Sequence, residues 1–191
     1  LFDSLMLILS SNSSFVGDTT LLQQYSIHLL SEKIMLNDNG YLYNNSSFVY
    51  ESEPLAVYSF MLRPNVAEKM EIRLPDKLGQ DLLTRFHNHD ESVAVNHFED
   101  YFKGIVIVPD VQQSYSLLSF QVSDSLSALV LHYHIEGGYE NHQQLVFSPN
   151  TATQFNQLTH DRLDTPMEPY PLKKVEIPSA DLGNRGLLFA G

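Results

Sequence analysis

Three histidines in the C-terminal half of the chain carry the clearest potential for chemistry. His132 and His134 alternate within 126–135, a segment whose apolar pattern predicts a strand. Side chains two positions apart on a strand share one face at about 7 Å, a spacing that suits a transition metal if a third ligand approaches. His142 follows a Gly137-Gly138 turn signal and is the candidate third ligand. The alternative is that His132 and His134 are ordinary half-buried strand residues.

A second candidate site is aromatic. Tyr41 and Tyr43 follow a strong turn signal at 37–40 and would share a face if a strand begins at Tyr41. Tyr50 lies further along the same segment, and Asn44 stands beside Tyr43. Exposed rings can stack on the faces of sugar rings, so these residues indicate a carbohydrate-binding surface. The absence of tryptophan argues against it, and the alternative is that the rings cover a sheet edge.

Signals for catalysis are weak. The chain has no cysteine and no GxSxG sequence, so neither a thiolate nor a serine at a nucleophile elbow is available. No glycine loop has the context needed to hold phosphate. With 23 acidic residues, some carboxylate pair meets the spacing of a glycosidase by chance, so a glycan hydrolase stays an alternative without assigned residues. We therefore expect no enzyme, no catalytic residue and no cofactor.

Charge and hydropathy restrict the partners. The chain has 191 residues and a net charge of −12, which repels phosphate backbones and anionic lipid surfaces. Nucleic acid is therefore not an expected partner. No apolar run approaches the ~20 residues that cross a bilayer as a helix. The chain opens at Leu1 already in a strand-like pattern, which suggests a processed or trimmed product.

Alternating apolar residues predict a mainly β chain. Leu5, Leu7 and Leu9 alternate with apolar Met6 and Ile8, so the first strand has two apolar faces and belongs inside a sheet. The segment 10–20 is small and polar and is expected to be a loop. Further strands are expected at 25–30, from 41, at 56–62, 71–74, 105–108, before Gln121, at 126–135, 143–147, 154–160 and 187–190.

Two helices interrupt the strands. One is expected to be capped by Asp76, with Leu78, Leu82, Leu83 and Phe86 on one face. The other would start at Ser92, place Phe98, Tyr101 and Phe102 on one face, and end at Gly104. The run 105–108 that follows is wholly apolar and is expected to be buried on both faces.

These elements predict an antiparallel β-sandwich with two or more short inserted helices, because strands and helices do not alternate regularly. The sandwich domain is expected over 1–163. From 164 to 191 the composition shifts to prolines and then a last apolar run, which indicates an extended arm with a terminal strand at 187–190. Such an arm could add itself to an exposed sheet edge of a partner.

Five short motifs follow one another in a recognisable order. They are Asp3-Ser4-Leu5 with Gly17-Asp18-Thr19-Thr20, the segment 72–83 (IRLPDKLGQDLL), 101–107 (YFKGIVI), 129–133 (LVLHY), and Phe155-Asn156 with His160-Asp161. In this order they resemble the Bacteroidetes domain-of-unknown-function family 4270. The resemblance implies a jelly-roll-like sandwich in exported or lipid-anchored outer-membrane proteins, and no catalytic residue is established for the family.

From this resemblance we expect a non-catalytic exported module that mediates protein–protein interaction or assembly at the outer membrane or cell surface. Its partner would be another outer-membrane protein or a glycan. It would touch the membrane only through a lipid anchor outside this chain. A carbohydrate-binding surface lipoprotein is the first alternative, and a glycan hydrolase is the second.

Overall fold

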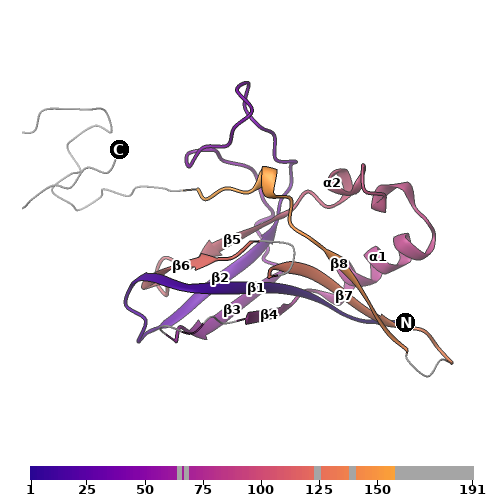
Figure 1. Cartoon of the computed structure of the whole chain (residues 1–191), viewed down its shortest axis with the longest axis horizontal. Coiled ribbons are helices and arrows are strands. Elements are labelled where there is room, and N and C mark those ends of the chain that lie inside the picture. The colour runs from indigo at the N-terminus through magenta and orange to yellow at the C-terminus, as the bar shows by residue number, and fades with distance from the viewer. Residues whose placement is uncertain (64–65, 67–68, 123–125, 138–140, 158–191) are drawn as a thin grey trace, which may run out of the picture.

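The computed structural model describes residues 1–63, 66, 69–122, 126–137 and 141–157, and within them the chain is mainly β (Figure 1). The strands are β1 (Phe2–Gly17), β2 (Leu22–Leu29), β3 (Ala56–Met61), β4 (Lys69–Arg73), β5 (Ile105–Pro109), β6 (Ser116–Phe120), β7 (Ala128–His134) and β8 (His142–Phe147). The helices are α1 (Asp76–His87) and α2 (Phe98–Tyr101), with 3-10 turns η1 (Glu91–Val93) and η2 (Thr151–Thr153).

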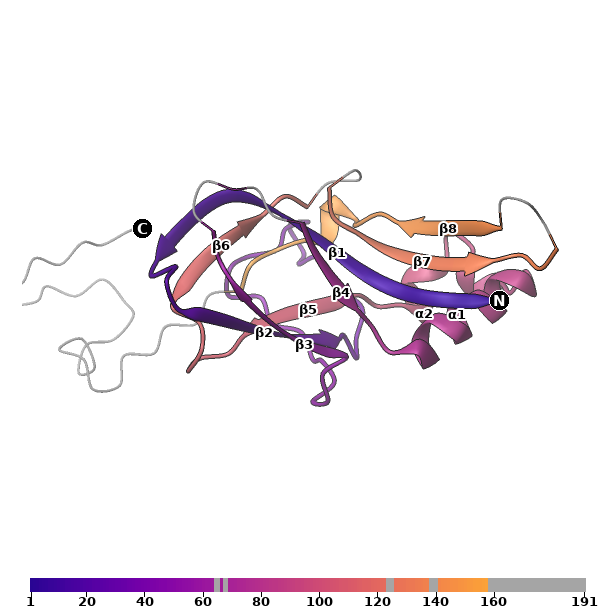
Figure 2. The same ribbon diagram turned by 90° about the horizontal axis from the view of Figure 1, so that it is seen from below.

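The strands form two antiparallel sheets, which confirms the predicted fold class. One sheet has the order β4-β1-β7-β8, and β6 pairs with the second half of β1. The other has the order β3-β2-β5. Figure 2 shows β1 and β7 in one layer and β2 and β5 in the other, with α1 and α2 at one end. The jelly-roll topology stays a prediction, and the proposed boundary at 163 and arm at 164–191 lie outside the described residues.

β1 is the central strand of the larger sheet. It lies between β4 and β7, as its two apolar faces predict. The expected loop at 10–20 is wrong, because β1 continues to Gly17 and pairs there with β6 after a register shift between Ser11 and Phe15. A polar segment becomes a strand here because a second strand supplies its hydrogen-bonding partner.

The core lies between the two sheets and is closed at one end by α1. Its buried members are leucines 5, 7 and 9 of β1, Tyr25 and Ile27 of β2, Phe60 of β3, Met70 and Ile72 of β4, Leu74, Leu82 and Leu83 of α1 and its approach, and Leu129 and Leu131 of β7. Tyr25 meets Phe60 edge-to-face, with ring centroids 5.3 Å apart. Alternate residues of each strand thus build one apolar layer.

Three local expectations about β5 and the helices need correction. β5 is half-buried and lies at an edge of its sheet, so it is not buried on both faces. Asp76 does not cap α1 with its side chain; it lies in the first turn and pairs with Arg73 at 2.8 Å. Phe86 of α1 is exposed, whereas Leu82 and Leu83 are buried.

The helix predicted from Ser92 is broken into η1 and α2. Asp90 caps η1 by accepting a hydrogen bond from the Ser92 backbone N–H at 2.9 Å. The short helix α2 still gathers its aromatic face, because Phe98 stacks on Phe102 and on Phe147 of β8. Gly104 has a φ of +120°, so the expected glycine is present, three residues after Tyr101, the last residue of α2.

Two predicted strands are absent from the described residues. No strand starts at Tyr41, and residues 154–157 follow η2 without regular structure. The expected hairpin between β7 and β8 is confirmed, but its connection is longer than two residues because His134 pairs with His142. The turn at 37–40 is also confirmed, with Gly40 at φ +79° and its N–H bonded to the Asn37 carbonyl at 2.8 Å.

Candidate functional site

The structure brings two of the three predicted histidines together. His134 of β7 and His142 of β8 are paired across the strands, with ring centroids 6.3 Å apart. His134 Nδ1 lies 2.7 Å from Asp3 Oδ1, and His142 Nδ1 lies 3.7 Å from Asp3 Oδ2. Asp3 reaches them because the β1–β7 register shifts between Phe2 and Ser4. The hydrogen bond from His134 is the main reason that the pKa of Asp3 is lowered from its usual value.

His132 does not join this pair. It stands opposite Ser4 and Gln144, and its side chain lines a hollow on the outer face of the sheet. Within the described residues, no group of three or more histidines and carboxylates is arranged to hold a metal ion. Asp3 and His134 are hydrogen-bonded directly to each other, so these two atoms leave no space between them for a metal ion. The predicted site at His132, His134 and His142 is therefore not assembled in the described residues.

The four described carboxyl groups whose pKa is shifted do not suit the general acid of a glycosidase. A general acid in such an enzyme needs a raised pKa, whereas the pKa of Asp3, Asp18, Asp81 and Asp90 is lowered in each case, mainly by hydrogen bonds. A surface hollow of about 480 Å³ lies against β2 and β5 and is lined by one carboxylate, that of Asp110. That carboxylate already accepts the backbone N–H of Gln112 at 2.7 Å.

The most distinctive surface feature is the connection between β2 and β3. We call residues 31–50 the projecting loop, since Figure 1 shows them rising away from both sheets. Its two ends are held side by side: the Leu30–Tyr50 bridge, the Ser31 N–H to Val49 carbonyl bond at 2.9 Å and the Glu32 carboxylate on the Val49 N–H close the base. A long loop with a fixed base and without regular structure of its own is typical of a functional surface.

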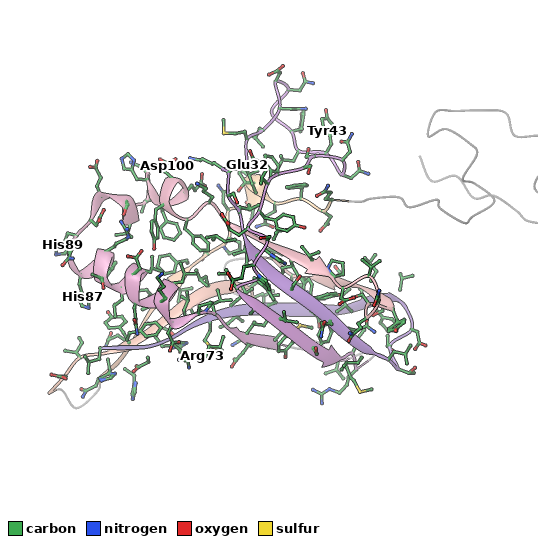
Figure 3. All side chains as sticks on the ribbon, turned by 180° about the vertical axis from the view of Figure 1, so that it is seen from behind. Glu32, Tyr43, Arg73, His87, His89 and Asp100 are labelled. Atoms are coloured by element: carbon green, nitrogen blue, oxygen red, sulfur yellow. The ribbon has the colours of Figure 1, made fainter. Side chains whose placement is uncertain are left out.

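The projecting loop exposes several large apolar residues among polar ones. Tyr41 is 65% exposed and Tyr43 is 49% exposed. Figure 3 places Tyr43 well away from the sheets and Glu32 near the base of the loop. The large exposed apolar residues of this loop are Met35, Leu36, Tyr41, Tyr43, Val49 and Tyr50. Monomeric proteins seldom gather so many of these residues in one short segment unless they bind a partner.

Interactions at its base anchor this loop to the sandwich. Tyr50 packs on His28, with ring centroids 5.0 Å apart, and His28 also contacts the Glu51 carbonyl at 2.8 Å through Nδ1. Phe48 meets Phe155 edge-to-face at 5.6 Å. Tyr50 therefore belongs to the base, although the sequence grouped it with Tyr41 and Tyr43.

Lys33 joins the projecting loop to α2. Its ammonium lies 3.1 Å from Asp100 and 3.4 Å from Glu99. The hydrogen bond to Asp100 is the main cause of the raised pKa of Lys33. The loop, α2 and the start of η2 thus form one connected region, because Glu99 also accepts a hydrogen bond from Asn150, which caps η2, at 2.8 Å.

The sequence predicted Tyr41, Tyr43 and Asn44 as binding residues on the assumption that a strand begins at Tyr41. That strand does not form. Asn44 is exposed beside Tyr43, whose backbone N–H donates to Ser46 Oγ at 3.0 Å. The sequence missed Met35, Leu36 and Val49. For Met35 and Leu36, the signal was an apolar pair directly before a turn and outside any alternating pattern.

Comparison with known proteins adds no relative. No protein-family model matches the chain, and neither a curated protein nor a solved structure matches it. The resemblance to family 4270 therefore stays a prediction. Among the described residues, no helix has the length and apolar character required to span a bilayer.

Proposed function

We propose that this protein is a non-catalytic binding module whose projecting loop docks into a pocket of a partner protein. The exposed apolar part of the loop on a hydrogen-bonded base carries the proposal. A fixed base means that little conformational entropy is lost when the loop is bound, so its apolar side chains contribute more of their burial energy to affinity.

A protein partner is favoured over a glycan by the kind of side chains exposed. Met35, Leu36 and Val49 are aliphatic, and such side chains fill apolar pockets in protein interfaces. Sugar recognition relies on aromatic faces together with polar side chains, and exposed Tyr41, Tyr43 and Asn44 suit it. The carbohydrate-binding alternative is therefore the second candidate.

The partner surface should be neutral or basic around its pocket. The chain carries a net charge of −12, so an acidic partner would be repelled at long range. If the partner surface is basic, we expect the association rate to fall as salt concentration rises, because screening weakens the attraction between opposite charges.

The proposed setting is export to the outer membrane or cell surface, with another outer-membrane protein as partner. This part of the proposal is supported by the sequence resemblance alone.

Site-specific photocrosslinking in the cells of origin tests the proposal. A photoreactive phenylalanine analogue would replace Tyr41 or Tyr43 in the full chain, and Tyr115, 47% exposed and outside the loop, would serve as the matched control. We expect one discrete protein adduct from positions 41 and 43 and none from position 115.

Two outcomes contradict the protein-docking proposal. One is the same adduct pattern at all three positions. The other is a glycan-array signal that disappears in Tyr41→Ala and Tyr43→Ala, which would establish the carbohydrate alternative. Turnover of any polysaccharide by the purified chain would overturn the non-catalytic assignment.

A further inference from the structure

β8 is an edge strand with an open side. In the part of the chain that the structure describes, β8 pairs with β7 alone, and Figure 2 shows it as the outermost strand beyond β7. Four of its six residues are exposed, and Val146 among them is 49% exposed. An open edge presents unpaired backbone N–H and C=O groups, which another strand can bind.

The register identifies which backbone groups of β8 are free. The Ile135 N–H donates to the Asn141 carbonyl at 3.0 Å, and the same pairing continues along β7 and β8. In an antiparallel ladder, the hydrogen-bonding groups of alternate residues point to opposite sides. Residues 141, 143, 145 and 147 therefore face β7, whereas His142, Gln144 and Val146 direct their N–H and C=O groups away from it.

His142 and Val146 are equally spaced on either side of Gln144 along the strand. If a second β8 approaches in the antiparallel direction, His142 of each copy stands opposite Val146 of the other, and Gln144 stands opposite Gln144. Every one of the free groups then finds a partner in a hydrogen-bonded pair. The two Gln144 side chains are also placed to exchange amide hydrogen bonds across the symmetry axis.

The charge pattern also permits self-association at this edge. The segment 141–150 contains no acidic and no basic residue apart from His142, although the whole chain carries a charge of −12. β4, at the opposite edge of the same sheet, presents exposed Lys69, Glu71 and Arg73. Exposed charges of this kind prevent edge-to-edge pairing, and β8 lacks them.

Pairing at β8 would also bring two surface hollows onto one sheet. The outer face of the larger sheet has a hollow of about 340 Å³. Its lining combines apolar residues such as Ile8 and Val146 with the charged Lys69 and Glu71. The hollow reaches β8, so two copies joined at this strand would place their hollows on one continuous sheet.

We propose that β8 is a self-association edge, and that two copies of this protein pair through it antiparallel with the two-fold axis at Gln144. This inference is independent of the projecting loop. The dimer would present two projecting loops on one assembly, so a partner with two pockets would be bound with higher avidity.

A charge-swap experiment on the full 191-residue chain tests the pairing and its register. Gln144→Lys sets like charges opposite each other at the axis, and so does Gln144→Glu. Each variant alone should therefore dimerise at least ~10-fold more weakly than the wild type by analytical ultracentrifugation. Mixed in equal amounts, the two variants should form a heterodimer that restores the wild-type affinity, because a lysine then faces a glutamate.

Gln80→Lys is the matched control, since it adds the same charge on the exposed face of α1. It should dimerise like the wild type. A wild-type chain that sediments as a monomer at every accessible concentration overturns the proposal. So does a dimer that neither charged variant weakens, and a dimer that both weaken without rescue on mixing refutes the two-fold register. Circular dichroism of each variant verifies folding.

Discussion

The Tyr101 hydroxyl donates a 2.7 Å hydrogen bond to Asp81 Oδ2, and this bond joins α2 to α1. Arg85 completes the connection: its Nε lies 2.9 Å from the same carboxylate oxygen, and its guanidinium stacks 4.6 Å from the centre of the Tyr101 ring. Burial and the bond to Asp81 raise the pKa of Tyr101 to about 12. The short helix α2 is therefore held by tertiary contacts, because four residues are too few to form a stable helix alone.

Tyr101→Phe should remove the tyrosine with the most strongly raised pKa among the described residues. Tyr101 keeps its proton in the folded state up to about pH 12, whereas an unfolded tyrosine loses it near pH 10. The stabilisation is therefore complete below about pH 10 and is lost as the pH rises toward 12. Absorbance at 295 nm should lose its highest-pH step in the variant, and the free energy of unfolding at pH 7 should fall by ~1 kcal/mol. Tyr41→Phe, on an exposed ring, is the control and should leave that free energy unchanged.

Gln23→Leu should destabilise the protein strongly. Gln23 is fully buried, donates through Nε2 to the carbonyls of Asp18 and Leu21, and accepts through Oε1 from the N–H groups of Tyr115 and Ser116. Leucine leaves these backbone groups without their partner in an apolar site, which costs ~3 kcal/mol. Urea unfolding measures it.

The neighbouring variant Gln24→Leu is the matched control for Gln23. Its amide bonds only to Ser59 Oγ on the exposed face of β2 and β3. We expect it to change the free energy of unfolding by less than ~0.5 kcal/mol. Equal effects of the two variants would show that the Gln23 network contributes nothing of its own.

Gly79→Ala should destabilise α1, although alanine is the better helix former. A Cβ at this position would lie 2.6 Å from Phe2 Cζ and 3.0 Å from Leu5 Cβ. The overlap costs ~1–3 kcal/mol, more than the gain of ~1 kcal/mol in helix propensity. Thermal unfolding should show a lower midpoint, and Phe2→Leu in the same chain should recover part of the loss. If Gly79→Ala alone raises the midpoint, the close approach of α1 to β1 is wrong.

Asp3→Asn should make the free energy of unfolding less dependent on pH in the acid range. The pKa of Asp3 is lowered in the folded protein, mainly by His134. Its contribution is therefore present above about pH 4, where the unfolded carboxylate is ionised, and is lost as the pH falls through the lower folded value. Urea unfolding between pH 2 and 7 should show a smaller loss in the variant than in the wild type. In a His134→Gln background the substitution should have a much smaller effect, and an undiminished effect there would assign the lowered pKa to another group.

The sequence alone determined the fold class and part of the core. Leu5, Leu7 and Leu9 alternate, and Leu82 and Leu83 share one helical face, so each segment encodes its own buried side. Alternation of this kind is local, and it correctly predicted antiparallel strands with inserted helices. The turn at 37–40 was equally local, since asparagine and glycine favour its conformation without help from distant residues.

Only the tertiary structure decided which strands find partners and which side chains meet. Ser10 to Gly17 extends β1 because β6 pairs with it, whereas Tyr41 and Tyr43 stay in a loop because no described strand pairs with them. Asp3 and His134 are 131 positions apart in sequence, and they meet where the register between β1 and β7 shifts. Strand pairing is a long-range interaction, so a local pattern fixes which face is buried but does not specify the neighbour across the ladder.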